Sequence, residues 1–179
     1  TFSYGYLSLE KLYQINKEAD KTSQHQLKKI SNIDSVANNV LQIKDDEYHL
    51  LLEPSERNPT DLSVLKQEVE ENIEENRQLF AALDEFDLNK TEKRLHQNLL
   101  SKLETLQTYH DDFFSFLEQN KMDEARTVWV EMQKTNKMVM ADLNEWHLIT
   151  MEELKHIRSD IKKENADSRL VLFYFLLFI

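Results

Sequence analysis

The sequence predicts an all-α protein: an antiparallel up-down-up-down four-helix bundle with two long and two shorter helices. Three observations predict this fold class. One glycine and two prolines among 179 residues are too few for the turns of a many-stranded sheet or for a phosphate-binding glycine loop. Turn-forming residues are confined to three short segments. Between those segments, apolar residues recur at steps of three and four, as on one face of a helix.

The first predicted helix spans residues 8–52, and its apolar stripe is interrupted. Apolar residues at its start are followed by polar stripe positions before the stripe resumes at Ile30. Those polar positions are Asn16, Ser23 and Gln26. The helix is expected to end in the segment 53–60, where two prolines break helical structure and Thr60 is expected to cap the next helix.

The second predicted helix spans residues 61–87 and carries Asn76 within its apolar stripe. It is also strongly acidic, which is typical of a solvated face. The acidic residues are Glu68, Glu70, Glu71, Glu74 and Glu75. The third helix spans residues 91–119. Either Asn89 or Thr91 is expected to cap its start, with Glu92 three residues after Asn89.

The fourth predicted helix spans residues 122–169 and follows a turn in which Asn120 suits a left-handed cap. It contains no proline or glycine, and Asn136 lies in its apolar stripe. Asn76 and Asn136 are interpreted as core residues that fix the helix register or form hydrogen bonds. His110, in the stripe of the third helix, is interpreted as a core histidine.

The unequal helix lengths divide the predicted molecule. At about 1.5 Å per residue, the first and fourth helices are each about 70 Å long and the other two about 40 Å. All four helices can therefore pack together along only part of the long pair. The remainder, about residues 8–26 and 150–169, is expected to be a two-helix stalk. Two helices bury little surface, so the stalk is expected to form a homodimer through the first helix.

Both ends of the chain suggest a membrane. Residues 170–179 are consecutive apolar residues without a charge, about half of the twenty that a membrane-spanning helix needs. They are expected to begin a transmembrane helix that lies outside the ligand-sensing domain, residues 1–169. Residues 2–7 are rich in aromatic side chains and are expected to be the interfacial end of a preceding span. A buried core helix or a terminal strand is the alternative for residues 170–179, and a frayed tail for residues 2–7.

Two long helices flanked by membrane segments and enclosing two shorter ones resemble the sensor domain of bacterial methyl-accepting chemoreceptors. The turn into the fourth helix strengthens the resemblance. Tyr109, Phe113 and the run 116–118 precede Asn120, and Ala125 follows it. Many members of that family have a Gly-Asp pair at this turn, where this chain has Asn120; both residue types tolerate the left-handed conformation. The same bundle occurs on sensor histidine kinases and diguanylate cyclases.

The resemblance implies an extracytoplasmic sensor anchored in the bacterial inner membrane, with this domain in the periplasm. It implies binding of a small solute or a periplasmic binding protein near the membrane-distal end, homodimerisation, and signalling across the membrane by a small sliding of the fourth helix. Cytoplasmic signalling proteins are then expected to be reached through an output module outside this chain. Such signalling requires that the ligand bind one of two packings more tightly.

Antiparallel pairing places the end of the first helix near the start of the fourth. The candidate ligand-binding residues in this region are Lys44, Tyr48, Arg126, Trp129 and Gln133, with Asn38 nearby. Cations, hydrogen-bonding groups and aromatic rings suit an anionic or amide-bearing solute. The alternative is that Lys44 and Arg126 are solvated charges and Trp129 is a core residue. Residues 30–52 contain no arginine, whereas aspartate and serine receptors of the family use several there, so amino-acid specificity is not expected.

Several classes of function are disfavoured by composition. The net charge of −11, from 22 basic and 33 acidic residues, opposes binding to nucleic acid. The absence of cysteine excludes disulfides, thiolate metal sites and cysteine catalysis. A single Glu-x-x-His at Glu153 and His156 falls short of the ligand set of a bundle di-iron site. No enzymatic activity, metal or cofactor is therefore expected. The alternative functions are the sensor domain of a histidine kinase or diguanylate cyclase, and a structural helical bundle that binds no solute.

Overall fold

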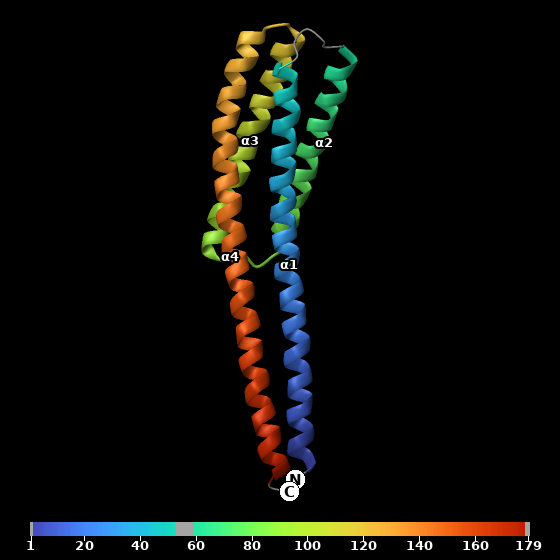
Figure 1. Cartoon of the computed structure of the whole chain (residues 1–179), viewed down its shortest axis with the longest axis vertical. Helices are drawn as coiled ribbons and strands as arrows, with labels where there is room; N and C mark the ends of the chain where they lie inside the picture. The colour runs from blue at the N-terminus through green and yellow to red at the C-terminus, as the bar shows by residue number, and fades with distance from the viewer. Residues whose placement is uncertain (1, 53–58, 178–179) are drawn as a thin grey trace. The chain divides into compact units, whose positions relative to one another are not determined.

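The computed structural model describes residues 2–52 and 59–177. Within these ranges it contains no strand and four α-helices (Figure 1): α1 (Phe2–Leu52), α2 (Pro59–Leu83), α3 (Lys90–Glu118) and α4 (Met122–Leu177). The first and last helices have 51 and 56 residues, and the middle pair have 25 and 29. The predicted fold class, with its long and short pairs, is confirmed.

The chain divides into two compact units. One, which we call the bundle unit, is Ser31–His147 and contains parts of all four helices. The other, which we call the stalk unit, consists of Thr1–Ile30 and Leu148–Ile179, and it contains only segments of α1 and α4. This division falls close to the limits that the helix lengths predict.

The contacts inside the bundle unit show that three pairs of neighbouring helices are antiparallel. Between α2 and α3, Lys66 pairs with Glu118 near one end of the contact, and the ring of Phe80 meets that of His96 near the other. Between α1 and α4, Asp34 pairs with His147, and Tyr48 stacks on Trp129. Between α3 and α4, Arg94 pairs with Glu145 and Lys102 with Asp142. In each pair of helices, the residue number rises along one helix as it falls along the other.

The helix ends agree with the sequence analysis at α3 and differ at α2. Asn89 caps α3 through its side chain, which accepts from the backbone N–H groups of Thr91 and Glu92, and the Glu92 side chain completes a capping box. Asn120 has φ 59°, the predicted left-handed conformation. Because α2 begins at Pro59, Thr60 lies inside this helix and not at its cap. Proline suits a first turn, where its missing N–H has no intrahelical partner.

Helix α2 also ends four residues earlier than residue 87, at Leu83. The reason is visible in the turn that follows: Phe86 and Leu88 are buried. In a continued helix, these two side chains would point to nearly opposite faces, because each residue turns the helix by about 100°. The turn allows both to be buried. The remaining core of the bundle unit is formed by stripe residues from all four helices, among them Val36, Phe80, Leu99 and Trp146.

The stalk unit buries few side chains. Among its described residues, Lys29, Ile30, Thr150 and Leu154 are buried, and Lys29 lies 3.8 Å from Glu153 in an ion pair. The Asn165 amide donates a hydrogen bond to the Asn16 oxygen at 2.9 Å, so a polar stripe position is matched by a polar partner. Large apolar side chains remain exposed, including Tyr13, Leu27 and Leu148.

Both terminal segments are helical as far as the structure describes them. Helix α4 continues to Leu177, and Leu170 and Phe173 are exposed on it. Residues 178 and 179 of the predicted transmembrane segment lie outside the described residues. No helix in the described ranges has both the length and the apolar character needed to cross a membrane.

Candidate functional site

A cavity of about 330 Å³ lies inside the bundle unit. All four helices contribute to its walls, and its lining is mostly aliphatic and aromatic. The apolar lining residues are Val40, Ile43, Ile73, Phe80, Ala81, Leu100, Leu103 and Leu106. The polar ones are Asn76, Arg77, Asp84, Glu104, Gln107, His110 and Asn136. A cavity of this size that combines an apolar surface with polar groups is typical of a site for a small organic molecule.

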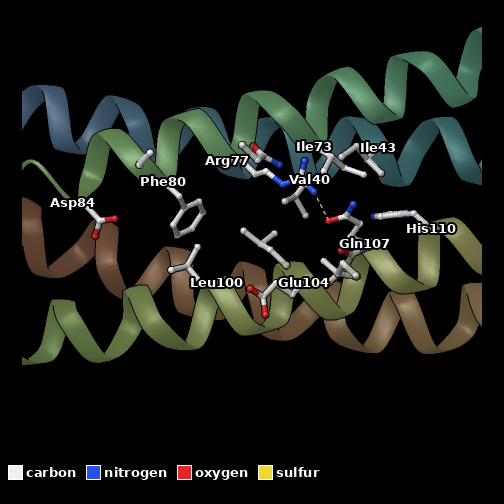
Figure 2. A pocket seen from close by; sticks show the side chains of 15 residues that line it. Val40, Ile43, Ile73, Arg77, Phe80, Asp84, Leu100, Glu104, Gln107 and His110 are labelled. Carbon is white, nitrogen blue, oxygen red and sulfur yellow. Dashed lines mark hydrogen bonds between the residues drawn. The ribbon is translucent and has the colours of Figure 1, made fainter.

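The charged lining residues lie where the cavity meets solvent. Figure 2 shows a hydrogen bond between Arg77 of α2 and Gln107 of α3, which joins the two helices across the cavity. The Arg77 guanidinium also pairs with Glu74, 3.0 Å away on the same helix. The side chain of Arg77 is 55% exposed, and that of Asp84 is 67% exposed. Glu104 is exposed as well.

The two lining asparagines are deeply buried and incompletely hydrogen-bonded. Asn76 of α2 and Asn136 of α4 are only 4% and 5% exposed. The Oδ1 atom of Asn76 and the Nδ2 atom of Asn136 have no hydrogen-bond partner among the described residues. An unsatisfied buried polar atom costs about 1–3 kcal/mol. Both residues are buried, as their stripe positions predict, but one amide atom of each lacks a hydrogen-bond partner in the described structure.

His110 lines one end of the cavity and connects it to a buried acid. Its Nδ1 atom is hydrogen-bonded to Oε1 of Glu47 on α1, and both side chains are buried. Burial raises the pKa of the Glu47 carboxyl, and the hydrogen bond with His110 opposes that rise. His110 is thus a core histidine, as the sequence analysis states, and it also contributes a ring to the cavity wall.

None of the residues proposed from the sequence lines this cavity. Tyr48 and Trp129 do come together, with stacked rings whose centroids are 5.7 Å apart. Nε1 of Trp129 and Nε2 of Gln133 are buried donors without a partner in the described part of the chain. Lys44 is half-buried, and Arg126 is exposed and pairs with Asp123 at 3.7 Å. We call these five residues the tip cluster: Lys44, Tyr48, Arg126, Trp129 and Gln133.

No sequence motif marks the cavity. Its one usable signal is that α2 and α4 each place an asparagine in an apolar stripe. Arg77, Asp84, Glu104 and Gln107 are ordinary residues of helix surfaces in the sequence. Among the described residues, no group of three or more histidine, aspartate or glutamate side chains is placed to hold a metal ion.

Comparison with known proteins agrees with this architecture. Residues 1–146 match a family described as a four helix bundle sensory module for signal transduction. Neither the comparison with curated proteins nor that with solved structures gave a significant match. The matched residues include nearly the whole bundle unit and the α1 segment of the stalk unit. The chain belongs to the family of chemoreceptor-type four-helix-bundle sensory modules for signal transduction.

Proposed function

We propose that this protein is the extracytoplasmic sensor domain of a dimeric transmembrane chemoreceptor, and that it binds a small solute in the cavity of the bundle unit. The observation that carries the proposal is the cavity of about 330 Å³, with its buried, partly unsatisfied amides, in a member of a sensory family. A purely structural bundle gains nothing from such atoms, because apolar side chains would fill the same space without their cost.

Ligand binding in the cavity is tested by thermal unfolding of the bundle unit in its full chain. A solute at about 100 times its dissociation constant stabilises the folded state by about 2.7 kcal/mol. In a calorimetric screen of small solutes, we expect at least one to raise the melting temperature of the wild type. Leu100→Trp, which places a larger side chain at a partly exposed lining position, is expected to remove that increase.

Val64→Trp is the matched control, because Val64 is an exposed α2 residue that does not line the cavity. This variant is expected to retain the increase in melting temperature. The tip cluster is the other location for a ligand. Binding that survives Leu100→Trp and is lost in Lys44→Ala or Arg126→Ala would move the site there. A screen without any binder would contradict the proposed sensing function.

Signal transmission is proposed to run along α4. This helix is continuous from Met122 to Leu177 and contains neither proline nor glycine. Such a helix has none of the usual points at which a displacement is absorbed by a kink. Asn136 brings α4 into the cavity wall, so a solute there contacts the same helix that continues into the stalk unit.

The proposed location is the periplasm, with anchorage in the inner membrane. The apolar run 170–179 and the exposure of Leu170 and Phe173 support anchorage beyond the stalk unit. The chain has no cysteine, so a single Lys137→Cys variant offers one thiol at an exposed position of α4. In intact cells with a permeabilised outer membrane, a membrane-impermeant maleimide is expected to label it. Labelling only after lysis would contradict the proposed location.

A further inference from the structure

Two residues of the cavity wall have unsatisfied atoms, one an acceptor and one a donor. Asn76 of α2 has an Oδ1 without a partner among the described residues, and Asn136 of α4 has such an Nδ2. A ligand group that satisfies both must donate one hydrogen bond and accept another. A hydroxyl does this with a single oxygen. Primary carboxamides, lactams and protonated carboxylic acids do it with two separate polar atoms, which can serve two side chains on different helices; ketones, ethers and hydrocarbons have no donor.

The charges around the cavity distinguish between these groups. Asp84 and Glu104 are acidic lining residues, and Arg77 is the only basic one apart from His110. The Arg77 guanidinium already pairs with Glu74 and donates to Gln107. His110 is hydrogen-bonded to Glu47. A carboxylate entering the cavity would thus meet two acids and a guanidinium that already pairs with Glu74, and it would lose its hydration. A neutral amide avoids that cost.

The apolar walls define the rest of the ligand. Phe80 of α2 and Leu100 of α3 face the cavity from opposite sides (Figure 2). Val40 and Ile43 line it from α1. A dry apolar cavity of about 150 Å³ accommodates benzene, so about 330 Å³ accommodates a ring together with a polar substituent.

We infer that the cavity of the bundle unit binds a small neutral carboxamide or lactam with an aromatic or branched aliphatic body, whose amide edge is held between Asn76 and Asn136. The inference rests on the proposed function, since it specifies the solute class of the same cavity. The ligand carbonyl accepts from Nδ2 of Asn136, and the ligand N–H donates to Oδ1 of Asn76.

Benzamide is the probe, measured by isothermal titration calorimetry on the full chain. Two analogues isolate the two parts of the argument. N,N-dimethylbenzamide keeps the carbonyl and lacks an N–H, and benzoate at neutral pH carries a charge. We expect benzamide to bind at least tenfold more tightly than either analogue, since tenfold corresponds to about 1.4 kcal/mol, the scale of one hydrogen bond. These comparisons require no variant protein.

Substitutions provide the second test. Asn76→Leu and Asn136→Leu are each expected to weaken benzamide binding by about tenfold. Asn39→Leu is the matched control: Asn39 is a buried α1 residue of the same unit, its Nδ2 also lacks a partner, and it does not line the cavity. This control is expected to bind benzamide within about twofold of the wild type. Circular dichroism confirms that each variant folds.

Three outcomes would overturn the inference: no benzamide binding at about 10 mM, benzoate binding as well as benzamide, or unchanged affinity in both Asn76→Leu and Asn136→Leu. The proposed function fails separately. If the solute screen finds a binder of another class that Leu100→Trp removes, the cavity is a sensing site and only the carboxamide assignment falls. If no solute binds there, both fall.

Discussion

Asp46 on α1 is a carboxyl group whose ionised form is disfavoured by the fold. Its Oδ2 atom is buried without a hydrogen-bond partner in the described structure. Burial raises its pKa above the usual 3.8, the nearby charges of Glu68 and Asp45 raise it further, and His49 partly opposes the rise. In the folded state, this group therefore holds its proton more strongly than in the unfolded chain.

Asp46→Asn is accordingly expected to raise the free energy of unfolding near neutral pH by about 0.5 kcal/mol, the scale of a partly exposed charge. Because the pKa of Asp46 is higher in the folded state, the stability that this group contributes is fully present below pH 3.8. The contribution is lost as the pH rises through the folded pKa. The advantage of the variant should thus disappear on acidification. Urea denaturation across a pH series measures this difference.

Asp45→Asn provides the comparison for that experiment, since Asp45 is the exposed neighbour. It is expected to change stability less than Asp46→Asn at neutral pH, because it removes only one of the charges that act on Asp46. If the stability advantage of Asp46→Asn stays constant down to acidic pH, ionisation of the Asp46 carboxyl does not destabilise the folded state, and the prediction is wrong.

Individual polar residues show the limit of what the sequence predicts. The acidic residues of α2 are exposed, as predicted, because five carboxylates in eight positions cannot all be desolvated. His110 is buried, as its stripe position predicts. Asn76 and Asn136 were expected to fix the helix register or to be hydrogen-bonded in the core; both are buried, and each has one amide atom without a partner among the described residues. A stripe places a residue in the interior, but it does not define the space left around that residue.

The start of α3 has a complete capping box. Asn89 Oδ1 accepts from the N–H groups of Thr91 and Glu92 at 2.9 and 3.0 Å. Oε2 of Glu92 accepts from the Asn89 N–H, and Oε1 of Glu92 accepts from the indole N–H of Trp146 on α4. One buried carboxylate therefore joins the cap of α3 to the neighbouring helix.

Asn89→Ala is expected to lower the free energy of unfolding by about 1 kcal/mol, because two backbone N–H groups lose their acceptor. Chemical denaturation monitored by circular dichroism measures the change. Asn98→Ala is the matched control in the middle of the same helix, where the side chain is exposed, and it should be neutral or slightly stabilising. Equal losses in the two variants would show that the cap contributes nothing specific.

Helix existence and order follow from the sequence because periodicity and turn residues agree along the chain. The boundaries of α2 are predicted less accurately from the sequence. Its first residue is Pro59, whereas a cap at Thr60 predicts that the helix begins at residue 61. Its end at Leu83 is determined by the burial of Phe86 and Leu88, a tertiary effect that the local pattern 84–88 does not contain.

For the whole molecule, the proposed homodimer follows from the poor burial within the stalk unit. Tyr13 and Leu27 of α1 are 69% and 45% exposed there. In a symmetric interface with a second copy, each such side chain is buried in both chains, so its contribution counts twice. Fully burying an exposed leucine contributes about 1.5–3 kcal/mol, and covering one that is 45% exposed contributes roughly half of that, so the exposed positions of α1 are the best places to test association.

Leu27→Glu is expected to weaken dimerisation by about tenfold or more, as measured by sedimentation across a concentration series. Val64→Glu serves as the control, since Val64 is equally exposed but belongs to α2 of the bundle unit. It should leave the association constant unchanged. A wild-type chain that stays monomeric throughout the series would contradict the homodimer. If the chain dimerises and Leu27→Glu leaves the association constant unchanged, the interface does not include Leu27.

The two tryptophans of the chain lie in contrasting surroundings within the bundle unit. Trp146 is fully buried against His96 and donates to Glu92, whereas Trp129 is half-buried and stacked on Tyr48. The emission maximum of an indole depends on the polarity of its surroundings, so the two tryptophans are expected to differ in emission maximum. Replacing either one by phenylalanine leaves a single tryptophan, beside the α3 cap or in the tip cluster. Quenching by iodide would then report on each region separately.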